Sequence, residues 1–427
     1  MNSSSNTKAE YVKKRRAEKE YHFGWPLRKR IIQKIERLNK RLTFGLLGKL
    51  MRTKKIQGKL PLSAVKKVLI LRTDAIGDMV VTSPLWRILK QADPSIKIGV
   101  AGSFRNLDLL RCDTDIDFTF DLTKKDKKEL AAEYKRCRDE QFDLVFCCTL
   151  HKRTKSAITA WKCAPKAYRV TTVSANPERH SEIFSKTIEV PDMEHLVPMP
   201  VQLQAMLEET IDLQVNDNDR YLSLSICNES RLSVQDRLNS LLDQTGTCRY
   251  IVINTESANV FREWGYEKNV ALANALSTQY SDLLIILSSS PNRENELVEF
   301  MASKQSPSRI TYFPTKDLHE LTALISLSSL VVTPDTSVVH LSSAERKPVI
   351  GFFLRHNEWL PYRVAARIFI PEERSAVSTI PLDPVLRSTI ELLDSNDINT
   401  QSIYYCTEPS TIKEVHPIEV NDLPFPY

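Results

Sequence analysis

Short apolar runs alternate with helix-like segments along most of the chain from Val65 onward. In the first half, this pattern predicts a helix directly after the first strand, a second helix over 126–140, and strands at 68–73, 96–102, 117–122 and 143–149. Runs this short that are apolar at successive positions are typical of strands buried on both faces of a parallel sheet. The pattern therefore predicts an α/β unit.

The same alternation restarts near residue 248. It predicts helices near 266–280, 292–304, 317–328 and 336–346, and strands at 249–255, 282–289, 309–313, 329–335 and 348–353. Two such units in tandem predict two Rossmann-like domains that face a cleft, with ligands outside the carboxyl ends of the strands. The stretch from about 212 to 247 is polar and irregular, and we expect the linker between the domains there.

Four regions follow from the pattern. We expect a basic N-terminal arm with an amphipathic helix over 1–60, a first Rossmann-like domain over 65–215, a second over 248–380, and a C-terminal helix and tail over 381–427.

The arm differs in charge from the body. Residues 1–60 contain 18 Lys and Arg against 4 Asp and Glu, whereas the remainder contains 41 against 49. Within 26–52, Leu and Ile recur every three or four positions between Lys and Arg, which predicts a basic amphipathic helix suited to an anionic membrane surface. The alternative is a solvated helix whose apolar stripe packs on the protein itself. Nucleic acid is not the expected partner, because no groove-reading motif accompanies the charge.

Several classes are disfavoured by what the sequence lacks. No apolar run approaches the roughly 18 residues of a membrane span, and the first residues lack the apolar core of a signal peptide, so we expect a cytoplasmic protein. The 8 cysteines form no C-x-x-C pair, so we expect reduced thiols and neither a disulfide framework nor a zinc site. No glycine-rich phosphate loop is present, which weakens interpretations as a kinase, an NTPase or an NAD enzyme.

The first candidate for chemistry is the segment 72–89, which follows the first strand and enters a helix. A carboxylate at this turn, Asp78, could accept the proton of an attacking hydroxyl. The alternative is that Asp78 only caps the helix, since the free N–H groups and the helix dipole favour an acid there. Asp74 competes for the same role or pairs with Arg72.

A second candidate is the segment 333–353, where Asp335, Thr336 and Ser337 open a helix. The N–H groups and hydroxyls at such a helix start form an anion site suited to a diphosphate, and His340, one turn inside, could face the same ligand. The alternative is that Asp335 or Thr336 caps the helix and His340 is an ordinary interface histidine.

Two further segments follow strands of the second domain. Arg262 could neutralise phosphate with its forked, permanently charged group, or form a surface salt bridge with Glu263 or Glu267. Glu294 could hold ribose hydroxyls with its carboxylate, or be an ordinary acid in the first turn of a helix.

The motif R-T-D-A-I-G-D at residues 72–78, followed at 333–353 by T-P-D-T-S-V-V-H-L and K-P-V-I-G-F-F, resembles the family-9 glycosyltransferases. The best known members of that family are the ADP-heptose:lipopolysaccharide heptosyltransferases. The resemblance runs from about residue 68 to about residue 393. It implies a GT-B fold, an acceptor domain followed by a nucleotide-sugar domain, an ADP-activated sugar donor, and inversion at the anomeric carbon.

The resemblance also implies roles for individual residues. Asp78 would be the general base, with Arg72, Asp74, Lys155 and Ser156 on the acceptor side. The donor side would comprise Arg262, Ser257, Glu294, Asp335, Thr336, Ser337 and His340. Two departures concern the donor, because many members have Gly at Ser337 and Gly-Gly-Pro at residues 289–291.

The expected reaction is therefore a single displacement of heptose from ADP-heptose onto a lipopolysaccharide or lipooligosaccharide core, or a related surface glycan. Arg262 and the helix starting near Thr336 would stabilise the leaving diphosphate. We expect no metal and no cofactor. We expect the acceptor to be a lipid-linked glycan at the inner face of the inner membrane. The alternative is a relative that binds a nucleotide sugar, or acts as a scaffold, without turnover.

Overall fold

The computed structural model describes residues 48, 50–149, 153–172, 183–189, 197–371, 376–395, 400–406 and 412–419. The chain divides into two compact units, residues 1–52 and residues 53–427, and the description below concerns the second. The amphipathic helix expected over 26–52 lies almost entirely outside the described residues.

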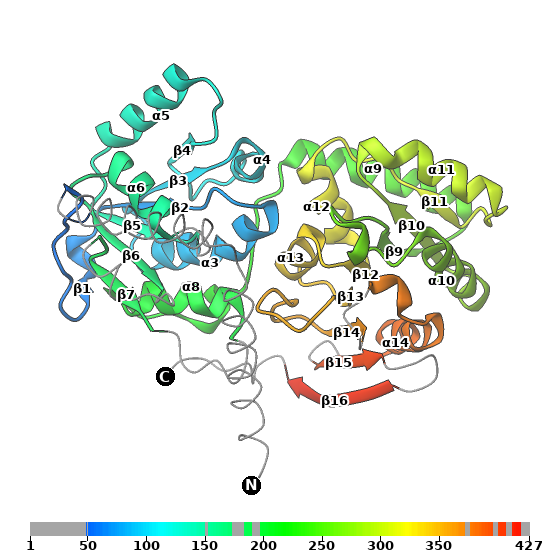
Figure 1. The fold of residues 1–427 in the computed structure, drawn as a ribbon. Coiled ribbons are helices and arrows are strands. Elements are labelled where there is room, and N and C mark those ends of the chain that lie inside the picture. The colour runs from blue at the N-terminus through cyan, green and yellow to red at the C-terminus, as the bar shows by residue number, and fades with distance from the viewer. Residues whose placement is uncertain are drawn as a thin grey trace, which may run out of the picture. The chain divides into compact units, whose positions relative to one another are not determined.

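The first half of this unit contains a six-stranded parallel sheet (Figure 1). Its order is β4-β3-β2-β5-β6-β7. The strands are β2 (Lys67–Leu71), β3 (Lys97–Gly102), β4 (Phe118–Asp121), β5 (Leu144–Cys147), β6 (Tyr168–Thr172) and β7 (Lys186–Ile188). Counted along the chain, this is the order 3-2-1-4-5-6 of a Rossmann sheet. A short parallel pair, β1 (Leu60–Pro61) with β8 (Ile211–Asp212), lies outside this sheet.

Five described α-helices belong to this half: α3 (Ile76–Ala92), α4 (Phe104–Leu107), α5 (Lys127–Asp139), α6 (Arg153–Cys163) and α8 (Met199–Glu208). Helix α3 packs against α8, and α5 packs against α6. The central strands β2, β3 and β5 are almost fully buried, which explains their apolar character in the sequence.

The second half contains an eight-stranded sheet of order β11-β10-β9-β12-β13-β14-β15-β16. Its strands are β9 (Arg249–Asn254), β10 (Leu283–Ser288), β11 (Ile310–Tyr312), β12 (Leu330–Pro334), β13 (Val349–Phe352), β14 (Ala366–Pro371), β15 (Thr400–Cys406) and β16 (Ile412–Glu419). The first six repeat the 3-2-1-4-5-6 order, and only β16 joins its neighbour antiparallel. The expectation of two parallel α/β sheets is therefore confirmed.

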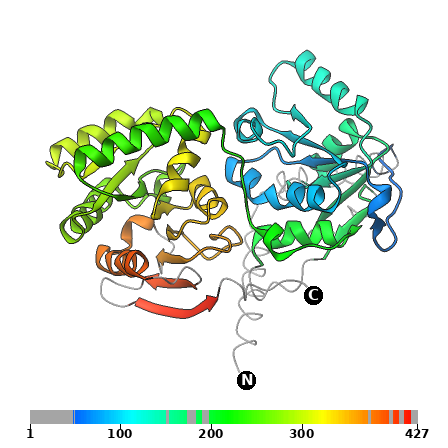
Figure 2. The same cartoon turned by 180° about the vertical axis from the view of Figure 1, so that it is seen from behind.

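Helices cover both faces of this second sheet, as Figures 1 and 2 show. They are α9 (Asn228–Thr245), α10 (Tyr266–Gln279), α11 (Glu294–Ser303), α12 (Leu318–Leu327), α13 (Ser337–Ala344) and α14 (Leu382–Asp394). Successive residues of β9 face opposite sides: Val252 joins one apolar core with Leu324 of α12, whereas Ile253 joins another with Leu272 of α10.

The region expected to be an irregular linker is only partly so. Helix α9 occupies residues 228–245 and packs against α12. Its fully buried positions are Ser230, Val234 and Leu238, one per turn, and the rest of the helix is mostly polar. Leu241 and Leu242 pack against the same core as Val234 and Leu238, so the expected linker in fact carries the apolar period of a helix. The C-terminal region contains the expected helix, α14, and adds two strands to the second sheet.

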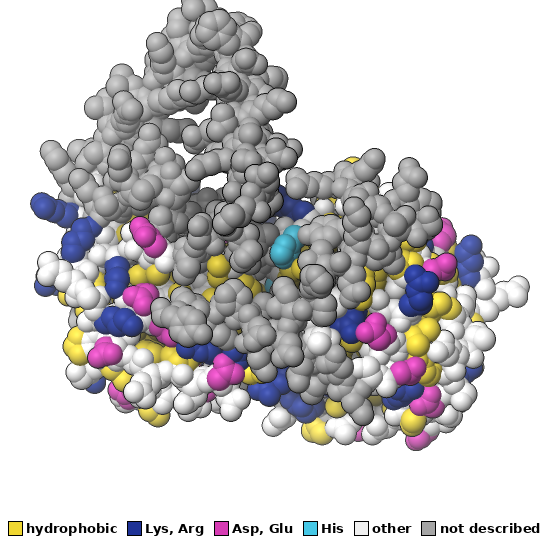
Figure 3. Space-filling model, turned by 90° about the horizontal axis from the view of Figure 1, so that it is seen from below, with side chains coloured by type: hydrophobic (Ala, Val, Ile, Leu, Met, Phe, Trp, Pro, Cys, Tyr) yellow, Lys and Arg dark blue, Asp and Glu magenta, His cyan; other side chains and the backbone are white. Residues whose placement is uncertain are grey.

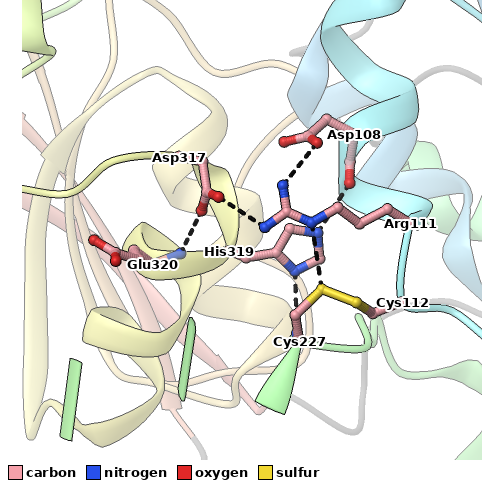
Figure 4. The surroundings of a disulfide bond; sticks show 7 residues. All are labelled: Asp108, Arg111, Cys112, Cys227, Asp317, His319 and Glu320. Atoms are coloured by element: carbon pink, nitrogen blue, oxygen red, sulfur yellow. Dashed lines mark hydrogen bonds and ion pairs between the residues drawn. A yellow bond between two sulfur atoms is a disulfide. The ribbon is translucent and has the colours of Figure 1, made fainter. Parts of the chain in front are cut away.

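The expectation that all cysteines are reduced is wrong for one pair. Cys112 and Cys227 form a disulfide with their Cα atoms 5.4 Å apart (Figure 4). The pair is separated by 115 residues and belongs to no motif, so only the fold brings it together. The bond joins the segment that follows the 3-10 turn Asp108–Leu110 to the residue that caps α9. Of the six free cysteines, only Cys248 is exposed.

The same junction holds an ion-pair network (Figure 4). Arg111 contacts Asp108 at 3.0 Å and Asp317, beside α12, at 2.7 Å. His319 of α12 accepts the backbone N–H of Cys227 at Nδ1, 3.3 Å away, and its Nε2 lies 2.9 Å from the carbonyl of Asp108. Covalent, ionic and hydrogen-bond contacts therefore join the two halves at one place.

The charge on one face of the molecule is mixed (Figure 3). On the portion of the face in Figure 3 that is not grey, Lys and Arg side chains are interspersed with Asp and Glu. Among the described residues, no helix is both long and apolar enough to cross a bilayer.

Candidate functional site

The first segment of the site connects β2 to α3. The Arg72 Nη2 atom lies 2.8 Å from Asp78 Oδ1, and Arg72 Nε donates to the Asp78 carbonyl at 3.0 Å. Arg72 also contacts Asp74 at 3.3 Å and donates from Nη1 to the Cys148 carbonyl after β5. The expected pairing of Asp74 with Arg72 is therefore present, and Arg72 holds Asp78 as well.

Asp78 also caps its helix. The Ala75 N–H donates to Asp78 Oδ2 at 2.9 Å, which is the capping arrangement weighed as the alternative to catalysis. The two interpretations are compatible, because each oxygen of an ionised carboxylate has two acceptor sites and only one is occupied on each. The Asp78 side chain is 17% exposed, so a hydroxyl can still reach it.

Helix α3 approaches α13 at Gly77. A Cβ placed on Gly77 would lie 2.6 Å from Cδ2 of His340 and 3.3 Å from the Cα of Ser337. The first distance is shorter than real Cβ contacts and the second is tight, so any side chain at this position would displace His340, and the approach favours glycine. The two sequence motifs therefore meet directly, one contributed by each sheet.

His340 is buried beside this contact. Burial lowers the pKa of His340 to about 4, the negative charge of Asp78 opposes that shift, and the positive charge of Arg72 reinforces it. Within the described residues, its Nδ1 has no hydrogen-bond partner. The imidazole is therefore uncharged near neutral pH and lies next to the Arg72–Asp78 pair.

The second ion pair of the site joins two donor-side candidates. Arg262 contacts Asp335 at 3.1 Å, so it pairs with neither Glu263 nor Glu267, the partners weighed from sequence. Glu263 instead accepts from Arg293 at 2.6 Å. Burial raises the pKa of Asp335, and the nearby charges of Arg262 and Arg355 partly offset the rise.

The start of α13 is tied to the neighbouring strand. Thr336 is the N-cap and accepts from the Val338 N–H at 3.3 Å, as the capping alternative predicted. The Asn254 side chain at the end of β9 donates to Thr336 at 3.2 Å and to Thr333 at 3.0 Å. Because β9 and β12 are the first and fourth strands of a 3-2-1-4-5-6 sheet, this bridge spans the switch point where such sheets bind ligands.

The remaining donor-side candidates lie farther along the same sheet edge. Glu294 is the first residue of α11. Burial raises the pKa of Tyr312 at the end of β11, and the negative charge of Glu294 raises it further. The Ser257 N–H donates to Glu263 at 3.1 Å. No contact described for Glu294 or Ser257 reaches α13.

The acceptor-side candidates on α6 divide between surface and interior. Lys155 is exposed, whereas Ser156 is buried and donates to the Thr149 carbonyl at 3.2 Å. The Thr149 hydroxyl in turn accepts from the Thr73 N–H at 3.4 Å. Ser156 thus supports the loop that carries Arg72 and Asp74, and Lys155 is open to solvent.

Sequence reasoning missed three residues of this site: Asn254, Arg355 and Trp359. The last two lie in the loop between β13 and β14. The Trp359 ring is centred 5.7 Å from the Arg72 guanidinium and 6.0 Å from the His340 ring. The available signal was a charged and aromatic loop after the fifth strand of the sheet. Among the described residues, no group of three metal-ligating side chains is positioned to hold an ion.

The sequence model of glycosyltransferase family 9 (heptosyltransferase) matches residues 131–379, more than half of the chain. The chain belongs to glycosyltransferase family 9. The match includes the Arg262–Asp335 pair and His340 and begins downstream of Asp78.

Two curated relatives of this family-9 protein are lipopolysaccharide heptosyltransferases. Lipopolysaccharide heptosyltransferase 3 of Escherichia coli is 23% identical over 342 residues, which cover 74% of this chain and 95% of the relative. Lipopolysaccharide core heptosyltransferase OpsX of Haemophilus influenzae is 31% identical over 115 residues, which cover 27% of this chain and 32% of the relative.

Solved structures agree with this assignment at the level of the fold. A family-9 glycosyltransferase from Veillonella parvula superimposes with a TM-score of 0.64 at 17% identity, covering 80% of this chain and 99% of the other. The E. coli heptosyltransferase WaaC, solved with ADP, gives 0.59 at 16% identity, with coverages of 76% and 97%. The family-9 protein therefore has the two-sheet fold that the resemblance implied.

Proposed function

We propose that this family-9 protein is an inverting glycosyltransferase that moves a sugar, heptose from ADP-heptose, onto a lipopolysaccharide or lipooligosaccharide core or a related surface glycan. The observation that carries the proposal is the meeting of two strand-end segments at Gly77. The Asp78 carboxylate on one segment and the α13 N-terminus on the other flank this contact.

The proposed reaction is one displacement. The acceptor hydroxyl oxygen attacks the anomeric carbon and transfers its proton to the Asp78 carboxylate. The bond from that carbon to the diphosphate oxygen breaks, and the diphosphate leaves with the electron pair. A single attack from the opposite face inverts the anomeric configuration, and a base positioned in this way contributes typically about 10²- to 10⁴-fold to the rate.

The leaving group would be stabilised by a set of donor-side groups, here called the donor wall, which comprises Arg262 and the start of α13. The Arg262 side chain carries a permanent positive charge and is 42% exposed. The first N–H groups of α13 lie next to Asp335, the partner of Arg262. Fixed positive groups aimed at developing negative charge are the usual large electrostatic contribution to transfer reactions. Glu294 and Ser257 would extend this wall toward the nucleoside.

The choice of donor and acceptor is supported by the relatives. Two of them are named for heptosyl transfer to lipopolysaccharide, and WaaC of E. coli has been solved with ADP and with ADP-2-deoxy-2-fluoro heptose. Lys155, Ser156, Arg72 and Asp74 are proposed for the acceptor side. Attachment of residues 26–52 to the inner face of the inner membrane stays a prediction, because that segment lies almost entirely outside the described residues.

A donor screen tests the proposal. Purified protein is incubated with a lipid-A-type acceptor and with ADP-heptose or UDP- and GDP-sugars, and the product is read by mass spectrometry. We expect transfer from ADP-heptose only. We expect Asp78→Asn to keep the thermal unfolding profile and ADP binding but to lose transfer by about 10²- to 10⁴-fold.

Asp74→Asn is the matched control, because it removes a carboxylate that contacts the same Arg72. If Asp74→Asn abolishes transfer and Asp78→Asn does not, the base has been assigned to the wrong carboxylate. If no nucleotide binds and no donor is used, the chain is instead a non-catalytic scaffold with this fold.

A further inference from the structure

Trp359 lies in the loop between β13 and β14 of the second sheet, and this loop contacts the first half of the unit. Its loop leaves β13 after Phe352, and its N–H donates to Asn357 Oδ1 at 2.9 Å. The preceding Glu358 carbonyl accepts the N–H of Met199 at 2.9 Å, at the first residue of α8. The half-buried ring packs on an apolar core that contains residues of both sheets.

The Trp359 ring lies next to both neighbours of Asp78. The Arg72 guanidinium is 5.7 Å from the ring centre, within the range of a cation–π contact. The His340 ring meets it edge to face, with centres 6.0 Å apart and planes at 71°. Arg72 pairs directly with Asp78. His340 lies against Gly77, the residue that precedes Asp78.

The contacts of Trp359 act on the Asp78 carboxylate indirectly, through Arg72 and His340. An aromatic face on Arg72 limits the guanidinium to one orientation and keeps water from it, which strengthens its pairing with Asp78. An aromatic edge on His340 adds to the burial that keeps this imidazole uncharged. Arg72 and Asp78 are the charged groups known to act on His340, so protonation of the imidazole would place a new positive charge beside that pair.

We propose that Trp359 is a positioning residue for the transfer reaction, which fixes Arg72, the partner of Asp78, and His340, which lies against Gly77. This inference rests on the proposed function, in which Asp78 is the base. The side chain acts through its neighbours and forms no bond to the substrates. Because it is carried by a loop of the donor-side sheet, it makes the geometry of the base depend on the packing of that sheet.

The test compares Trp359→Ala, Trp359→Phe and Leu360→Ala in the full-length protein. Leu360 is the next residue of the same loop and packs on a different apolar cluster, so it controls for loosening of the loop. Steady-state kcat and KM for donor and acceptor are measured over a range from about pH 7.5 to about pH 5.5, which brackets an ordinary histidine.

We expect Trp359→Ala to lower kcat by roughly 10-fold with KM nearly unchanged, since misplaced catalytic groups cost rate rather than binding. The ratio of variant to wild-type kcat should fall further as the pH decreases, because water admitted to His340 raises its pKa toward the ordinary value. Trp359→Phe should restore both properties to within about 3-fold, and Leu360→Ala should leave them unchanged.

Two results would overturn the inference. A rise in KM with kcat unchanged would mean that the ring binds a substrate. Equal losses in Trp359→Ala and Leu360→Ala with parallel pH profiles would mean that the ring only stabilises the loop. Asp78→Asn, measured alongside, separates this inference from the proposed function: if Asp78→Asn stays active, the base assignment itself fails, whatever Trp359 does.

Discussion

Two Arg–Asp pairs occupy comparable places in the two sheets. Arg72 follows β2 and Arg262 follows β9, and each is the first strand of a 3-2-1-4-5-6 order. Their partners, Asp78 and Asp335, each lie at or next to the start of a helix, and the two carboxylates are 17% and 15% exposed. By residue type and topology alone, the two pairs look interchangeable.

The arginines differ sharply in exposure. The Arg72 side chain is 1% exposed and donates to Asp78 twice and to Cys148. The Arg262 side chain is 42% exposed, and the bonds described for its guanidinium go to Asp335. A buried guanidinium with fixed partners holds geometry, whereas an exposed one retains donors for an incoming anion. The comparison teaches that two Arg–Asp pairs of the same residue types differ in burial, and we predict that the buried arginine positions its partner whereas the exposed one binds an anion.

A large loss of stability is expected when the buried arginine is removed. Arg72→Met should lower the free energy of unfolding by about 3 kcal/mol, because loss of one partner leaves a partly buried charge unpaired. Urea unfolding at neutral pH measures this change, with transfer activity assayed in parallel. A loss below about 1 kcal/mol would place this pair with ordinary surface salt bridges and remove the contrast.

The next effect concerns the histidine beside this pair. The pKa of His340 is lowered to about 4, so the unfolded state takes up a proton that the folded state refuses as the pH falls from about 6.5 toward 4. Wild-type stability should therefore decrease across this window. The variant His340→Gln should lose roughly 3 kcal/mol of that pH dependence.

Chemical unfolding at several pH values measures the slope. An unchanged slope in His340→Gln would show that the imidazole is not held neutral in the folded protein. The environment of Arg72 would then be more solvated than its burial implies.

Removing the disulfide tests whether the difference in burial between Arg72 and Arg262 depends on the covalent link between the two halves. Cys112→Ser should lower stability by about 2 to 4 kcal/mol, because the bond closes a long loop in the unfolded chain. Cys248→Ser, at an exposed free cysteine, is the control and should have little effect. The differing responses of Arg72 and Arg262 variants should persist in the Cys112→Ser background. If the Arg72 and Arg262 variants lost similar stability in that background, the disulfide would be what maintains the difference in burial between the two arginines.

The smallest effect on stability belongs to the exposed arginine. Arg262→Ala should cost less than about 1 kcal/mol of stability, yet weaken ADP binding by roughly 10-fold or more, the value of a charge-assisted hydrogen bond. Calorimetry with ADP measures the binding. Arg262→Lys keeps the charge and should retain part of the affinity. Unchanged ADP affinity in Arg262→Ala would remove this residue from the donor wall.

The central strands of both sheets, β2, β3, β5, β9, β10, β12 and β13, were predictable because each is a short apolar run that is mostly buried, whereas β6, β7, β14, β15 and β16 were not predicted. β9 and β10 are apolar at nearly every position, so their ranges of 249–254 and 283–288 lie within one or two residues of the expected ones. Helix α9 was missed although Val234, Leu238, Leu241 and Leu242 recur at helical spacing and pack on one apolar core. Its other positions are mostly polar, which favoured the expectation of a linker.

The site residues divide in the same way. Asp78, Arg262 and His340 were found from motifs at strand ends, where topology concentrates ligand sites. Their partners were not: the pairing of Arg262 with Asp335 and the contact of Trp359 with Arg72 join residues far apart in sequence. No local spacing encodes such distances.

By itself, the sequence determined the central strands of the two sheets, which carboxylates and cations follow them, and that Gly77 precedes a candidate base. Only the tertiary structure decided that Arg72 is buried and Arg262 is exposed, that Cys112 meets Cys227, and that His340 lies against Gly77. The physical reason is that periodicity and strand order arise from neighbours along the chain, whereas burial, pKa and ion pairing arise from whatever the packed fold places nearby.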